Sequence, residues 1–165
     1  MFLSMATLLL FVSQCTIVQS DANLIRQICK RTPNSNLCVT SLLSDRKSST
    51  ADVNGLALIM VGVLKAKSTS TLNLINQKLK KSPALKQPLT SCARKYGAIL
   101  TGDIPQATEA LQKGDPKFAE SGANDAAIEA DTCEAGFKGR SPITASNKLV
   151  HDISGVTAAI VRNLL

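Results

Sequence analysis

The chain has 165 residues and a formal net charge of +7, and only 3% of its residues are aromatic. Proteins that bind nucleic acid gather Lys and Arg on one face and stack bases on aromatic side chains. Here the basic residues are scattered, Tyr96 is the only tyrosine and there is no tryptophan. This composition argues against nucleic acid, and we expect the basic surface to suit a protein partner with acidic groups.

The first 20 residues are typical of a secretory signal peptide. They contain no Asp, Glu, Lys or Arg, and residues 8–12 form a short apolar core. Val18 and Ser20 provide small side chains before a cleavage site at Asp21, and the apolar run is too short to span a membrane. We therefore expect a secreted domain of residues 21–165 that keeps the whole positive charge.

The cysteines of the secreted domain predict two disulfides. Cys15 would leave with the signal peptide, and an even set remains at Cys29, Cys38, Cys92 and Cys133. Four cysteines in an oxidising compartment allow three pairings. A turn-rich stretch with Pro and Asn separates Cys29 from Cys38 and could fold the chain back on itself. We therefore predict the pairs Cys29–Cys38 and Cys92–Cys133.

Apolar residues recur every three or four positions through most of this domain, which is the period of amphipathic helices. Residues 21–43 are predicted as two short helices around Pro33, with a polar connector over 44–50. A long helix is predicted over 51–81, ending at a cluster of lysines before Pro83. Its core-facing stripe is expected to comprise Val53, Leu56, Met60, Val63 and Lys67, flanked by Ala57, Leu64, Leu72, Ile75 and Leu79.

A second long helix is predicted from Pro88 to Leu111. Its apolar face continues past Pro105, which is expected to kink the helix or to mark a restart. Gly, Asp and Pro at 114–116 then form the clearest break in the chain, because proline keeps Asp115 out of the helical region. Asp115 is well placed to cap the helix that follows.

The third helix has a core seam made mostly of alanine, at Ala119, Ala123, Ala126, Ala130, Cys133 and Phe137. Small side chains let a neighbouring helix approach closely. Cys133 lies on this seam and Cys92 on that of the second helix, so their bridge would join adjacent antiparallel helices. After residues 138–142, the last helix has its apolar face at Ser146, Val150, Ile153, Thr157, Ile160 and Leu164.

Together these elements predict an all-α protein. The expected architecture is an up-and-down four-helix bundle over residues 50–165, preceded by a helical hairpin over residues 21–45. One disulfide is expected within the hairpin and the other within the four-helix bundle.

We find no group of residues that indicates catalysis. His151 is the only histidine, and its neighbour Asp152 suits a surface hydrogen bond better than a catalytic pair. An acidic cluster lies on the third helix at Asp125, Glu129, Asp131 and Glu134. Glycoside hydrolases place paired carboxylates in a walled cleft, whereas an exposed helix face leaves them solvated. The cysteines contain no CxxC pair for zinc. We therefore expect no enzyme activity, no metal and no cofactor.

Several short stretches carry a resemblance that covers essentially the whole secreted domain. They are ICKRTP at 28–33, LC at 37–38, LLSD at 42–45, LALIM at 56–60, Cys92 with Tyr96, DTCE at 131–134 and AIVRNLL at 159–165. In this order they resemble the plant invertase and pectin methylesterase inhibitor family. The resemblance implies a hairpin on a four-helix bundle, inhibition of another enzyme, and a location in the apoplast, cell wall or vacuole.

Residues 107–120 point to one branch of that family. They read ATEALQKGDPKFAE, which resembles the cell-wall and vacuolar invertase inhibitors. In that branch a Pro-Lys-Phe tripeptide enters the active-site cleft of invertase, and it maps here to Pro116, Lys117 and Phe118. The resemblance implies an acid invertase (a β-fructofuranosidase) as a one-to-one partner and a complex favoured at mildly acidic pH. The alternative is a pectin methylesterase inhibitor, since those proteins share the fold but lack the tripeptide.

The tripeptide also suits this role on physical grounds. Pro116 would fix the backbone of a loop between two helices, Phe118 would supply apolar area to a pocket, and Lys117 could reach the carboxylates of a glycosidase. The competing interpretation is that Asp115 and Pro116 only start a helix while Phe118 packs in the core. A different function, as a carrier of lipid or another small ligand, would need a hollow interior, which the tight alanine seam disfavours.

Overall fold

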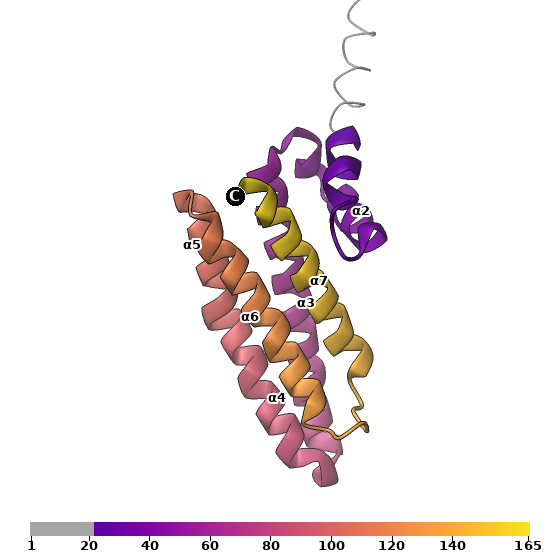
Figure 1. Ribbon diagram of the computed structural model, residues 1–165. Coiled ribbons are helices and arrows are strands. Elements are labelled where there is room, and N and C mark those ends of the chain that lie inside the picture. The colour runs from indigo at the N-terminus through magenta and orange to yellow at the C-terminus, as the bar shows by residue number, and fades with distance from the viewer. Residues whose placement is uncertain (1–21) are drawn as a thin grey trace, which may run out of the picture.

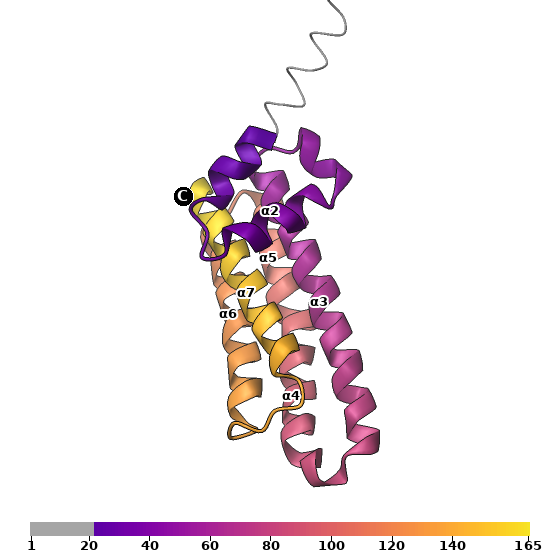
Figure 2. The same ribbon diagram turned by 90° about the vertical axis from the view of Figure 1, so that its right-hand side faces the viewer.

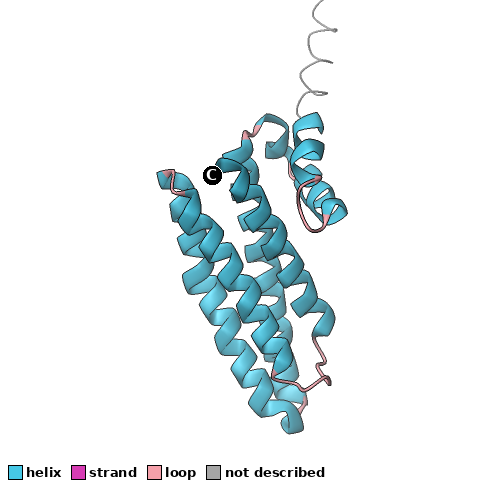
Figure 3. Cartoon of the chain, viewed as in Figure 1, coloured by secondary structure: helices cyan, strands magenta, loops and turns pink. Residues whose placement is uncertain are grey.

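Four long helical segments lie side by side, and a short helical hairpin sits at one end of them, near the C-terminus (Figures 1 and 2). The computed structural model describes residues 22–165, and this part of the chain consists of helices joined by short turns (Figure 3). The all-α bundle with an appended hairpin is confirmed. The predicted signal peptide, residues 1–20, and Cys15 lie outside the described residues.

The hairpin is made of a helix over residues 22–29 and helix α2 (Ser35–Leu43). The side chain of Asn34 caps α2 by accepting a hydrogen bond from the backbone, as short polar residues do at helix starts. A disulfide closes the hairpin between Cys29 and Cys38, whose Cα atoms are 5.5 Å apart. This pairing is the predicted one.

Helix α3 (Val53–Lys81) follows a 3-10 turn, η1 (Arg46–Thr50), that occupies the predicted connector. Asp52 caps α3 by accepting a hydrogen bond from the Gly55 N–H at 2.8 Å. Lysines in its last turn complement the negative end of the helix dipole. By length and composition alone α3 could cross a membrane, but it packs against the other long helices of the bundle as a core helix does.

The core face of α3 differs in part from the predicted stripe. Its buried residues are Leu56, Ala57, Met60, Val61, Leu64, Ser68, Thr71 and Ile75. Lys67 is exposed, so its assignment to the core stripe is wrong, whereas Val63 is partly buried and packs against the core. The first half of α3 is apolar on nearly every side, and the apolar pattern there does not choose a face. Two small polar residues that the predicted stripe left out, Ser68 and Thr71, are buried in the core.

Helices α4 (Lys86–Ala98) and α5 (Ile104–Lys113) run on without a break through a π-helical turn, η3 (Ile99–Asp103). A short 3-10 turn, η2 (Pro83–Leu85), leads into α4 from α3. The expected disturbance at Pro105 takes the form of this wider turn just before it. Pro105 then stands in the first turn of α5, where a missing backbone N–H is tolerated.

Helices α6 (Pro116–Ala135) and α7 (Thr144–Val161) complete the bundle, and a 3-10 turn, η4 (Arg162–Leu164), ends it. The predicted seam of α6 is buried at Ala119, Ala123, Ala126, Ala130 and Cys133. The second predicted disulfide joins α4 to α6, with the Cα atoms of Cys92 and Cys133 4.7 Å apart. Both the alanine seam and this pairing are confirmed.

Gly122 of α6 packs closely against the η3–α5 segment. A Cβ atom at this position would lie 2.6 Å from the backbone oxygen of Asp103 and 3.2 Å from the Cβ of Ala107. Backbone cannot yield as a flexible side chain can, so the packing requires glycine here. The small-residue seam therefore extends to a direct contact between helix backbones.

A chain of hydrogen bonds, buried at Tyr96 and nearer the surface at Glu134, links α4, α6 and α7. The Tyr96 hydroxyl donates to Asn147 Oδ1 at 2.8 Å, and Asn147 Nδ2 donates to Glu134 Oε2 at 2.6 Å. Thr144 Oγ1 donates to the other oxygen of Glu134 at 2.5 Å. Burial raises the pKa of Tyr96 well above its ordinary value, so this phenol stays a donor. The expectation that Glu134 is a solvated member of an acidic cluster is therefore wrong.

Candidate functional site

The turn between α5 and α6 lies at the same end of the bundle as the C-terminus (Figure 1). Gly114 ends α5 in the left-handed conformation, with φ +74°, which glycine adopts without strain. The Asp115 N–H then donates to the Ala110 carbonyl at 2.8 Å. Two residues therefore suffice to reverse the chain, and the next helix begins at once.

The Pro-Lys-Phe tripeptide forms the first turn of α6. The expected loop is therefore wrong, because Pro116 is already the first residue of the helix. Asp115 caps it, its Oδ1 accepting from the Phe118 N–H at 3.5 Å. Proline suits the first helical position because its fixed φ is helical and its missing N–H has no partner there anyway. The tripeptide is thus held on a rigid helix end.

Both side chains of interest in the tripeptide point into solvent. Phe118 is 60% exposed, and the side chain of Lys117 is 73% exposed. The competing interpretation, in which Phe118 packs in the core, is therefore wrong. Among the described residues Phe118 is the one aromatic residue in the set of exposed large hydrophobic side chains, which also includes Leu43, Ile128 and Leu165.

A shallow hollow beside the Phe118 ring is lined by Gln106, Glu109, Ala110, Lys113 and Asp115. Gln106 Nε2 donates to the Phe118 carbonyl at 3.3 Å, which ties α5 to the start of α6. Glu109 and Lys113 form an ion pair along α5, and hydrogen bonding to Lys113 lowers the pKa of Glu109. The ring is thus an apolar centre within a polar and charged rim, which is how energetically important contact residues are commonly arranged.

Glu120 lies beneath Lys117, and only 11% of its side chain is exposed. Its Oε1 accepts a hydrogen bond from Arg162 Nε of η4 at 2.6 Å, and its Oε2 accepts one from Lys117 Nζ at 3.2 Å. The bond from Arg162, more than the contact with Lys117, lowers the pKa of Glu120 against the opposing effect of burial. Glu120 was not among the predicted site residues.

Two further acidic residues of α6 form separate pairs with neighbouring helices. Glu129 accepts from Lys95 Nζ at 3.0 Å, and Asp131 lies 2.9 Å from the Nδ1 of His151. His151 therefore pairs with Asp131 across two helices and not with its neighbour Asp152. Among residues 22–165 no group of three or more His, Cys, Asp or Glu side chains could hold a metal ion.

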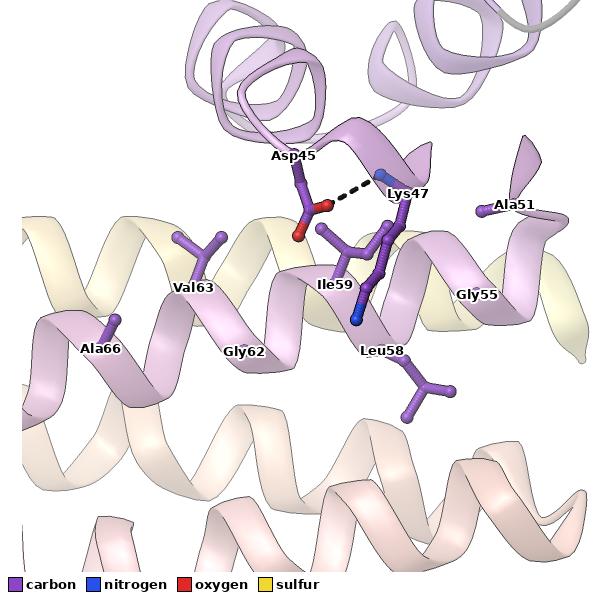
Figure 4. A pocket seen from close by; sticks show the side chains of 9 residues that line it. All are labelled: Asp45, Lys47, Ala51, Gly55, Leu58, Ile59, Gly62, Val63 and Ala66. Carbon is purple, nitrogen blue, oxygen red and sulfur yellow. Dashed lines mark hydrogen bonds between the residues drawn. The ribbon is translucent and has the colours of Figure 1, made fainter. Parts of the chain in front are cut away.

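A second hollow lies on the outer face of α3, below η1 (Figure 4). Its floor is apolar, and its lining residues are Asp45, Lys47, Ala51, Gly55, Leu58, Ile59, Gly62, Val63 and Ala66. The backbone N–H of Lys47 donates to Asp45 Oδ1 at 2.9 Å at its upper edge. This hollow lies outside the bundle, whereas the bundle interior is filled by side chains such as Tyr96, so the arrangement does not favour an enclosed-ligand carrier.

Comparison with known proteins places these features in a family. The family described as "Plant invertase/pectin methylesterase inhibitor" matches residues 23–161. The chain is 49% identical over 141 residues to "Cell wall / vacuolar inhibitor of fructosidase 1" of Arabidopsis thaliana, an alignment that covers 86% of this chain and 69% of that protein. It is 30% identical to the "Pectinesterase inhibitor" of Actinidia deliciosa, over 84% of this chain and 77% of that protein.

A solved structure agrees with this assignment. The crystal structure of a mutant form of a pectin methylesterase inhibitor from Arabidopsis superposes with a TM-score of 0.72 at 26% identity, covering 82% of this chain and 93% of that one. All of these proteins are described as inhibitors of enzymes, in agreement with the expectation that this chain is itself not an enzyme. The chain therefore belongs to the plant invertase/pectin methylesterase inhibitor family.

Proposed function

We propose that this protein inhibits a plant acid invertase by placing the first turn of α6 in the substrate cleft of the enzyme. Pro116, Lys117 and Phe118 would make the contact, and one inhibitor would block one enzyme. The observation that carries the proposal is the exposure of both side chains on a helix end, 60% for Phe118 and 73% for Lys117. The 49% identical relative, described as an inhibitor of fructosidase, supports the choice of target.

Each residue of the tripeptide has a physical task in this proposal. The Phe118 ring would lose its exposed apolar area to the enzyme pocket, which favours association. The Lys117 ammonium would face the two carboxylates with which a glycoside hydrolase performs its reaction. Pro116, with the cap at Asp115, would keep the turn in one conformation, so that little backbone entropy is lost on binding.

The same proposal implies where the protein acts. A secretory signal over residues 1–20 would deliver it to the apoplast and cell wall or to the vacuole, and the description of the Arabidopsis relative names the cell wall and the vacuole. Both compartments would also hold the acid invertase. Salt would weaken a complex that depends on a lysine meeting carboxylates, since it screens charges at the rim of an interface.

The experiment is an inhibition assay of the purified, disulfide-bonded protein against an acid invertase. We expect Lys117→Ala and Phe118→Ala each to raise the inhibition constant about tenfold or more, as loss of a central contact residue does. Ile128→Ala is the matched control, because Ile128 is equally exposed, 60%, on the same helix but far from its start. Circular dichroism should be unchanged in all three. Equal inhibition by both tripeptide variants and wild type would contradict the proposal.

Inhibition of pectin methylesterase is the second candidate. The Actinidia relative, 30% identical, and the superposed Arabidopsis structure are both described as inhibitors of this kind of enzyme. Such a function would use faces of the same bundle and would not need the tripeptide. A parallel assay against a pectin methylesterase separates the two: inhibition there, without inhibition of invertase, would replace the first proposal by the second.

A further inference from the structure

We propose that Glu120 is a positioning residue for the tripeptide: its carboxylate, anchored by Arg162, holds the Lys117 ammonium in the orientation that meets the target. This inference rests on the proposed function, since it concerns how Lys117 is presented to the enzyme. It extends the functional site from the start of α6 to the C-terminal turn η4. Neither Glu120 nor Arg162 needs to touch the target for this role.

The geometry joins three side chains in a row. Lys117 and Glu120 are three residues apart on α6 and therefore lie on the same side of the helix, with Lys117 Nζ 3.2 Å from Glu120 Oε2. The other carboxylate oxygen, Oε1, lies 2.6 Å from Arg162 Nε. Each carboxylate oxygen of Glu120 thus contacts a different cation, Lys117 on the same helix or Arg162 on η4.

The burial of Glu120 explains why Arg162 is needed in this arrangement of three side chains. A carboxylate with 11% of its side chain exposed is costly to keep ionised unless a partner compensates the lost hydration. Arg162 supplies that partner from 42 residues further along the chain, and its hydrogen bond lowers the pKa of Glu120. The carboxylate therefore stays charged at mildly acidic pH and remains available to Lys117.

A comparison with a neighbouring ion pair shows what is special here. Lys113 also pairs with a glutamate on its own helix, Glu109, but both side chains are largely exposed, 70% and 64%. When both side chains of an ion pair are exposed, the pair restricts the conformation of neither one strongly. Lys117 instead has a buried, doubly held partner, so the ion pair restrains the one exposed member. An ordered lysine loses less rotamer freedom when it enters a complex.

Two other roles for Glu120 make different predictions. If it only fastened the C-terminal turn to α6, its loss would weaken inhibition whether or not Lys117 were present. If it competed with the carboxylates of the target for Lys117, its loss would strengthen inhibition. A positioning role predicts a loss that depends on Lys117, which is what a double-mutant cycle measures.

The cycle consists of wild type, Glu120→Gln, Lys117→Met and the double variant, each assayed as an inhibitor of acid invertase. Glutamine keeps the size of Glu120 without its charge, and methionine keeps much of the apolar stem of Lys117. We expect Glu120→Gln to raise the inhibition constant about 3- to 10-fold, the effect of restoring freedom to one long side chain, and to have no further effect once Lys117 is methionine. Glu129→Gln is the matched control, because it removes the same charge from an ion pair with Lys95 further along α6, away from the tripeptide, and it should leave inhibition nearly unchanged.

The outcomes separate this inference from the proposed function. If Lys117→Met weakened inhibition but Glu120→Gln did not, or if Glu120→Gln acted equally on both backgrounds, the positioning role alone would be overturned. If Lys117→Met inhibited as well as wild type, the proposed function would fail and this inference with it. The free protein offers a second readout that does not need the enzyme. NMR of the lysine ammonium groups should show Lys117 more ordered than Lys113 in wild type but equally mobile in Glu120→Gln, and equal mobility already in wild type would contradict the inference.

Discussion

Replacing Asp103 by asparagine is expected to stabilise the folded protein at neutral pH and to have little effect near pH 4. Asp103 closes the π-helical turn η3, and its Oδ2 is buried without a hydrogen-bond partner. Burial, followed by the negative charges of Asp125 and Glu129 on α6, raises its pKa from the ordinary 3.8 to about 6. Lys95 neutralises part of this field by pairing with Glu129, but no cation pairs with Asp103 itself among the ion pairs of the described residues.

The magnitude follows from the difference between the folded and unfolded states. A rise from 3.8 to about 6 corresponds to about 3 kcal/mol, and solvent screening of this partly exposed group reduces the expected effect to about 1–2 kcal/mol. The folded state binds the Asp103 proton more tightly than the unfolded state does. Asp103 therefore costs no stability at a pH where it is protonated in both states. Its cost grows as the pH rises from about 4 to about 6 and is fully present above that. Asparagine carries no charge at any pH and removes this loss.

The assay is urea denaturation followed by circular dichroism, with both disulfides intact, at about pH 7.5 and about pH 4. The free energy of unfolding of Asp103→Asn should exceed that of wild type at the higher pH, and most of the difference should vanish at the lower pH. Asp152→Asn removes the same charge from an exposed pair with Lys148 on α7 and serves as the control. A destabilised Asp103→Asn variant at pH 7.5, or a difference that did not change with pH, would refute the reasoning.

Three further predictions concern packing, the buried network and the complex. Gly122→Ala should lower the free energy of unfolding by about 1–3 kcal/mol, because the new methyl group meets the Asp103 backbone. Gly97→Ala, on an open part of α4, should instead raise it by about 0.5–1 kcal/mol, and an equal effect at both positions in urea denaturation would contradict this account. Tyr96→Phe should cost about 1–2 kcal/mol, since Asn147 loses a buried donor; no loss of thermal stability would show the hydrogen bond to be dispensable. The inhibitor should bind invertase more tightly at low salt, because salt screens the contact between Lys117 and carboxylates, and equal affinity at low and high salt in calorimetry would count against that contact. The resemblance to the cell-wall and vacuolar invertase inhibitors also implies tighter binding at mildly acidic pH, and equal affinity from about pH 4 to 8 would contradict this expectation.

Local patterns in the sequence predict much of the fold. The three- and four-residue spacing predicts the helices, and the turn-rich stretch between Cys29 and Cys38 predicts the first disulfide. The pairing of Cys92 with Cys133 follows once both are placed on the seams of neighbouring helices. The helix cap at Asp115 can also be predicted from the sequence, because Asp followed by Pro strongly favours the start of a helix.

Features that depend on three-dimensional neighbours were missed or only partly predicted. In the second half of α3, Ser68 and Thr71 are small and polar, so the apolar pattern could not mark them as core residues. At Pro105 the sequence predicts a disturbance but not its form, a π turn. In the candidate site, the spacing of Lys117 and Glu120 could have suggested their ion pair, but no local signal connects Glu120 with an arginine 42 residues away.

The central claim is that the start of α6 occupies the cleft in which invertase binds its substrate. The most direct test is the dependence of inhibition on substrate concentration, measured at steady state with the wild-type inhibitor. Because substrate and the first turn of α6 would exclude one another, the apparent inhibition constant should rise in proportion to the substrate concentration above KM. An apparent inhibition constant that did not change with substrate would mean that the protein binds elsewhere on the enzyme, and the account would be wrong.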